Sequence, residues 1–76
     1  MIIIVRTLNS IYTFITDHEG KTTVQGTGDY FEEPASCKFP TIRINHPIWI
    51  EAPTEEKPYR VVTTSIVRGI EHIDGA

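Results

Sequence analysis

The sequence places apolar residues on both faces of its strand-like segments. Residues 2–5 form an unbroken β-branched run, and residues 11–16 put isoleucines on one parity and aromatic residues on the other. The segment 59–67 also mixes apolar residues of both parities. A sheet with one face in water alternates apolar and polar side chains. The chain therefore has more apolar strand surface than one small core needs, which predicts that a partner covers part of it.

The length of the chain, 76 residues, limits it to one domain, which we predict as a single β domain over residues 1–76. A chain of this size buries only about 60% of its unfolded surface, so small domains add disulfides, a metal or oligomerisation. The single Cys37 excludes an internal disulfide, and the three histidines are too scattered to predict a metal site. We therefore expect a homo-oligomer, with a twofold dimer favoured, while a monomer with a tight core is the alternative.

Secondary structure follows from residue type and spacing. Ile, Val and Thr dominate the apolar segments, and no window of helical length shows helical spacing free of Gly or Pro. We predict an all-β fold, a small barrel or a strongly bent antiparallel sheet of roughly five to seven short strands. The predicted strands are residues 2–7, 10–16, 21–25, 41–45, 48–51, 59–65 and 66–71. The last two could be one long strand bent by a bulge near Ser65.

Two turns and one long loop connect these segments. Residues 17–20 end on Gly20 and predict a tight hairpin turn, and the proline-bounded residues 53–58 predict a hairpin loop. The irregular stretch from residue 26 to residue 40 contains Tyr30 and Phe31. Loops of this length often carry function, so we predict both aromatic residues at an interface.

Trp49 has the opposite parity to its apolar neighbours along the predicted strand. Ile48 and Ile50 share even parity, whereas Trp49 and Glu51 share odd parity, so a straight strand puts Trp49 on the polar face. One interpretation is that Trp49 covers the end of a barrel or lies under the long loop. The other is that it belongs to an interface or a ligand site, where tryptophan is enriched.

The sequence contains no recognisable catalytic motif, such as a P-loop, a GxGxxG segment or a nucleophile elbow. We therefore expect neither enzymatic activity nor a cofactor. The net charge of −3 argues against nucleic acid, although a small barrel that stacks bases on its aromatic residues is an alternative. The apolar start is too short for a signal or a membrane span, and a lone cysteine favours a cytoplasmic protein.

Two polar clusters interrupt the apolar segments near the ends of the chain. The six residues are Arg6, Asn9, Ser10, Thr64, Ser65 and Arg68. The first and last strands of small barrels often pair, which would bring the two clusters together. Arginine binds phosphate and carboxylate in a forked geometry, so this arrangement predicts a site for a small anionic, nucleotide-like ligand. The alternative is a structural junction whose hydroxyls satisfy backbone groups.

The same residues carry a resemblance. The pattern Arg6-Thr7-x-Asn9-Ser10 with Tyr12, and Thr64-Ser65-x-Val67 near the end, resembles short uncharacterised proteins of actinobacteria and their phages. The resemblance implies a compact cytoplasmic β domain of phage origin and supplies no catalytic residue. We therefore expect a non-enzymatic binding module that inhibits a bacterial defence system by binding a protein effector or sequestering a small anion. The alternatives are a structural component of a virion or larger complex and the nucleic-acid-binding barrel.

Overall fold

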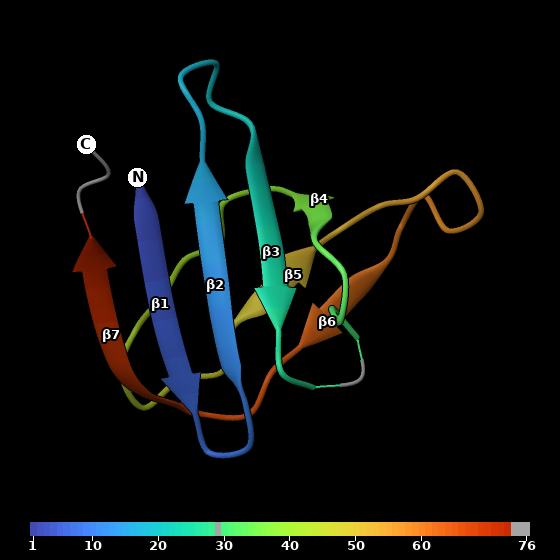
Figure 1. The fold of residues 1–76 in the computed structure, drawn as a ribbon. Helices are drawn as coiled ribbons and strands as arrows, with labels where there is room; N and C mark the ends of the chain where they lie inside the picture. Colours follow the sequence, from blue (N-terminus) through green and yellow to red (C-terminus); the bar gives the residue numbers. More distant parts are fainter. Residues whose placement is uncertain (29, 74–76) are drawn as a thin grey trace.

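The computed structural model describes residues 1–28 and 30–73, which form seven strands and no helix (Figure 1). The strands are β1 (Ile2–Thr7), β2 (Ile11–Thr16), β3 (Thr22–Gly26), β4 (Ala35–Cys37), β5 (Trp49–Glu51), β6 (Val61–Thr63) and β7 (Val67–Ile73). Five of them form an antiparallel sheet in the order β4-β3-β2-β1-β7, and β5 pairs with β6 in a second sheet. The all-β prediction is confirmed. Across the described residues the strands form two separate sheets and not a closed barrel.

The core lies between the two sheets, and β5 and β6 cross behind the larger sheet in Figure 1. Alternate residues of β1, β2 and β3 point inward, because successive side chains of a strand face opposite sides. The buried apolar residues are Val5, Tyr12, Phe14, Val24, Phe31, Ile48, Ile50, Ala52, Val62 and Val67. Phe31 is only 1% exposed, so its predicted place at an interface is wrong. It belongs to the core because its ring packs edge-on against Tyr12, with ring centroids 6.4 Å apart.

The predicted turn at residues 17–20 is confirmed, and it joins β2 to β3. Gly20 has a φ of 82°, which glycine adopts without steric cost. The Asp17 carboxylate accepts hydrogen bonds from the backbone N–H groups of Glu19 and Lys21, both at 2.9 Å. The short polar side chain thus stabilises the turn, as the residue types predict.

Gly26 ends β3 opposite Tyr12 of β2. A Cβ atom at Gly26 would lie 2.8 Å from Cδ1 of the Tyr12 ring, which is closer than carbon atoms pack. The missing side chain therefore lets the aromatic ring lie over the strand and reach Phe31 in the core.

The predicted strand at residues 41–45 is wrong. The chain turns there, since Asn45 has a φ of 68° and the His46 N–H bonds to the Arg43 carbonyl at 3.3 Å. The segment instead follows the start of β7, where Asn45 and His46 exchange backbone bonds with Val67. β4 was not predicted because it spans only three residues and depends on pairing with β3.

Residues 59–71 do not form one bent strand, because β6 and β7 belong to different sheets. The chain changes sheet at Thr64, whose hydroxyl donates to the Ser65 carbonyl at 2.7 Å and accepts from the Ile48 N–H at 3.0 Å. The irregularity in the larger sheet lies between Arg6 and Thr7, where β1 pairs with β7, and not near Ser65, where the alternative of one bent strand placed it.

The outer face of the larger sheet is rich in isoleucine. We call Ile2, Ile4, Ile11, Ile15 and Ile73 the isoleucine face. Ile2 lies directly opposite Ile15 on one side and Ile73 on the other, so a row of three isoleucines crosses β2, β1 and β7. Ile11, Ile15 and Ile73 are exposed, and Ile2 and Ile4 are half-buried. Apolar side chains therefore lie on both faces of the larger sheet in the structure, as the sequence predicts.

Candidate functional site

The hairpin of β5 and β6 fixes the position of Trp49. Ile48 and Ile50 are fully buried on the inner face, and they hold the strand so that Trp49 points outward. The Trp49 side chain is 70% exposed. The predicted separation of Trp49 from its isoleucine neighbours is thus confirmed, and the tryptophan is not a core residue.

Other large apolar side chains lie near Trp49, and one of them, Phe39, also contacts the buried Phe14 ring at a centroid distance of 6.3 Å. We call Phe39, Trp49, Tyr59 and Val61 the Trp49 surface, because each is exposed and each lines at least one of two hollows that share Glu51 and Val61. Trp49 pairs with Thr63 across the hairpin, and Val61 lies diagonally opposite it. The first hollow, of about 420 Å³, joins Phe39 to Trp49, and the second, of about 320 Å³, lies beside Tyr59.

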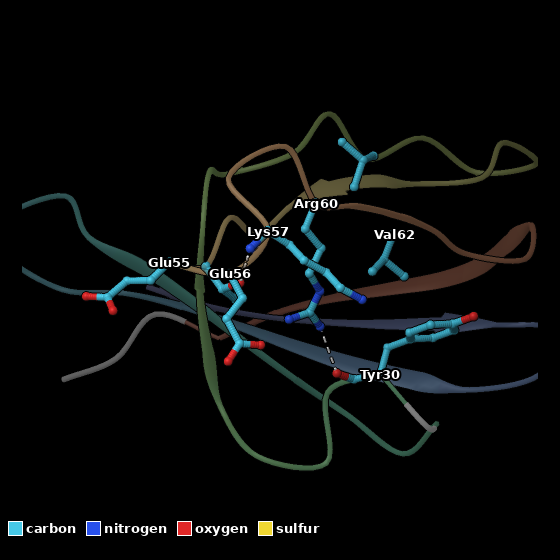
Figure 2. A pocket seen from close by; sticks show the side chains of 8 residues that line it. Tyr30, Glu55, Glu56, Lys57, Arg60 and Val62 are labelled. Carbon is cyan, nitrogen blue, oxygen red and sulfur yellow. Dashed lines mark hydrogen bonds between the residues drawn. The ribbon is translucent and has the colours of Figure 1, made fainter.

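A third and larger hollow of about 840 Å³ adjoins the same hairpin (Figure 2). Tyr30 borders it on one side, and the β5–β6 loop with Val61 and Val62 borders it on the other. Tyr30 is exposed, and its role at an interface stays a prediction. The hollow is thus open to a chain or side chain that approaches β6.

Arg60 connects the two sides of the large hollow. Its guanidinium donates to the Tyr30 carbonyl at 3.1 Å and lies 5.1 Å from the ring centroid of the buried Phe31. A cation over an aromatic ring is attracted by the negative face of the ring. Arg60 therefore links the long loop to the start of β6, and Figure 2 shows its bond to the Tyr30 carbonyl.

The charges around the Trp49 surface are mixed. Lys38 and Glu51 form an exposed ion pair at 3.9 Å, which contributes little to stability in water. Burial raises the pKa of the Cys37 thiol in β4, so the thiol stays neutral near pH 7. Within residues 1–28 and 30–73, no group of three His, Cys, Asp or Glu side chains is placed to hold a metal ion. The surface offers apolar area and hydrogen-bonding groups, which suit recognition.

The structure brings the two predicted anion-binding clusters together. β1 pairs with β7, as predicted for the first and last strands, and the backbone N–H of Asn9 lies 3.3 Å from the Ser65 hydroxyl. Arg6 and Arg68 are exposed at the same end of this strand pair, and the Arg6 guanidinium lies over Gly69. Neither arginine forms an ion pair with another described residue.

Several hydroxyl groups of these clusters form hydrogen bonds within the chain. The buried Thr64 hydroxyl bonds to Ile48 and Ser65, and the Ser65 hydroxyl accepts from Asn9. The backbone N–H of Ser10 donates to the Thr7 hydroxyl at 3.1 Å, inside the β1–β2 turn. These contacts favour the structural junction over the ligand pocket for the hydroxyl residues. The role of the six residues in binding an anion stays a prediction.

Sequence reasoning missed Phe39, Arg60 and Val61 around the hairpin, and it considered Tyr59 only among the aromatic residues of the nucleic-acid alternative. The register of the hairpin was the available signal, because pairing Trp49 with Thr63 places Val61 on the same face. Phe39 and Arg60 carry no comparable signal, since their places depend on the paths of loops.

Comparisons with known proteins do not assign the chain to a family. Protein-family models, curated proteins and solved structures were all searched, and none matches this chain. Over the part of the chain that the structure describes, there is no helix with the length and apolar character needed to cross a membrane.

Proposed function

We propose that this chain is a non-enzymatic binding module that receives a protein partner on the Trp49 surface. The observation that carries the proposal is the 70% exposure of Trp49 on a strand whose neighbouring isoleucines are fully buried. Exposing so large an apolar side chain is unfavourable in water, whereas tryptophan, tyrosine and arginine dominate the binding energy of protein interfaces. The resemblance to actinobacterial and phage proteins makes an effector of bacterial defence the first class of partner to test.

The test compares a variant on the Trp49 surface with a variant at an exposed apolar residue elsewhere on the chain. Affinity capture from an actinobacterial lysate supplies a candidate, which is then produced as a pure protein and titrated by calorimetry. We expect Trp49→Ala to weaken binding about 30-fold or more, the effect of losing a hot spot of about 2 kcal/mol. Leu8→Ala is the control, because Leu8 is 58% exposed but lies in the β1–β2 turn. Equal binding by the wild type and Trp49→Ala would refute the proposal.

We also propose that two copies of the chain associate through the isoleucine face. The row of three isoleucines across β2, β1 and β7 favours this second function, because such a face is apolar and can meet itself about a twofold axis. Ile15→Lys should then shift sedimentation equilibrium from dimer to monomer. Ile44→Lys is a matched control, since Ile44 is 45% exposed and Ile15 is 46% exposed. A monomer mass for the wild type at micromolar concentration would contradict the proposal.

A further inference from the structure

The outer edge of β6 has backbone groups that no neighbouring strand uses. Ala52 donates to the Arg60 carbonyl at 3.1 Å, and Thr64 donates to the Ile48 carbonyl at 2.9 Å. In an antiparallel ladder the hydrogen-bonded pairs alternate with pairs whose N–H and C=O groups point away. Ile50 and Val62 therefore bond to each other, whereas the N–H and C=O groups of Val61 and Thr63 face away from β5.

Nothing among the described residues occupies this edge. β6 pairs only with β5, and no other backbone hydrogen bond reaches Val61 or Thr63 from residues 1–28 or 30–73. The opposite edge of the hairpin differs, because the Glu51 carbonyl of β5 accepts from the Lys38 N–H at 2.9 Å. The open edge of the small sheet is thus the β6 edge.

The large hollow provides space beside this edge. It is lined by Val61 and Val62 of β6 and by Tyr30 across from them, with a volume of about 840 Å³ (Figure 2). The edge strand β7 is longer but its first residue, Val67, is already bonded to Asn45 and His46. The hollow at β6 therefore combines unpaired backbone groups with a bordering aromatic side chain.

We propose that the partner binds as an extended peptide segment that adds a third strand to the β5–β6 sheet along β6. This inference rests on the proposed binding function of the Trp49 surface and states how the partner is recognised. The N–H and C=O groups of Val61 and Thr63 bond to the peptide backbone, as in other cases of strand addition. Peptide residues opposite Val61 and Thr63 lie on the same side of the sheet as Trp49, so the segment alternates apolar residues toward Trp49 with residues facing Tyr30.

The first test removes one edge donor without disturbing the hairpin. A displayed library of random linear peptides is selected on the wild type, and the enriched peptides are synthesised. Thr63→Pro loses the N–H that faces the peptide but no bond of the β5–β6 ladder, a position where edge strands accept proline. We expect it to bind these peptides roughly tenfold more weakly or worse. Thr63→Ala keeps the N–H and is the matched control, with binding close to that of the wild type.

The second test uses the wild type alone, so a misfolded proline variant does not decide the matter. With bound peptide, amide hydrogen exchange measured by nuclear magnetic resonance should slow at Val61 and Thr63. It should change little at Val62, whose N–H already bonds to β5. Equal changes at all three amides, or no enriched peptide, would overturn the proposal.

The outcomes separate this inference from the proposed function. Peptides that lose affinity for Trp49→Ala but give no alternating protection would refute strand addition and leave the Trp49 surface as the binding site. Peptides that bind Trp49→Ala normally would contradict the proposed function itself. Alternating protection that appears without peptide and grows with protein concentration would identify a second copy as the occupant and overturn the inference.

Discussion

The structural-junction interpretation requires the Thr64 hydroxyl to stabilise the fold, and Thr64→Val tests this requirement directly. The substitution preserves the shape of the side chain but removes its bonds to the Ile48 N–H and the Ser65 carbonyl. Ile48 is fully buried, so its N–H would lose its partner at a cost of about 1–3 kcal/mol. The lost bond to Ser65 adds about 0.5–1.5 kcal/mol, because Ser65 is only half-buried and water can replace the donor.

The two losses together come to about 1.5–4.5 kcal/mol, which at about 4–8 °C per kcal/mol for a domain of this size corresponds to a melting temperature roughly 6–36 °C below that of the wild type. Thermal unfolding followed by circular dichroism measures the change. Thr64→Ser keeps the hydroxyl and loses one methyl group, so its cost should stay near 0.8 kcal/mol, about the value of one buried carbon. If Thr64→Val melts with the wild type, the hydroxyl does not hold the junction and the reasoning is wrong.

Three further predictions follow from burial and close packing. Trp49→Ala should cost only about 1–2 kcal/mol of unfolding free energy, because roughly a third of the residue is covered, whereas Phe14→Ala should cost about 3–5 kcal/mol. Chemical denaturation compares the two, and a loss of the larger size at Trp49 would contradict its exposed placement. Gly26→Ala should destabilise the chain by about 1–3 kcal/mol, since the new Cβ would meet the Tyr12 ring at 2.8 Å; an unchanged melting temperature would refute this contact. Burial raises the pKa of Cys37, so the folded chain holds the thiol proton more tightly than the unfolded chain does. The stability that comes from the neutral thiol is fully present below roughly pH 8.5 and is lost as the pH rises through the raised pKa. Cys37→Ala should therefore lose less stability than the wild type between neutral and alkaline pH, and a larger loss would count against burial of the thiol.

Several strands could be read from the sequence because local alternation sets them. β1 matches its predicted bounds, β2 begins one residue later than predicted, and β3 is shifted by one residue at both ends. The turn at residues 17–20 follows from its own residues, since the Asp17 side chain and the φ of Gly20 are local features. The outward placement of Trp49 was also readable, because parity along one strand separates it from Ile48 and Ile50.

The features that were predicted wrongly depend on contacts between segments that are distant in the sequence. Phe31 is in the core because the loop that carries it folds under Arg60 and Tyr12, and no local pattern records such a contact. Residues 41–45 include three β-branched side chains, but the segment forms no strand, and its Asn45 N–H bonds to the Val67 carbonyl at the start of β7.

The residues that share a face of each strand follow from local sequence, since the side-chain period of two is a local property of the backbone. Which of those faces is covered depends on how the two sheets pack against each other. The hairpin of β5 and β6 covers the inner face of the larger sheet and leaves the isoleucine face, Trp49 and the β6 edge in solvent. Burial depends on where a second sheet comes to rest, and that depends on long-range packing that the spacing of residues does not encode.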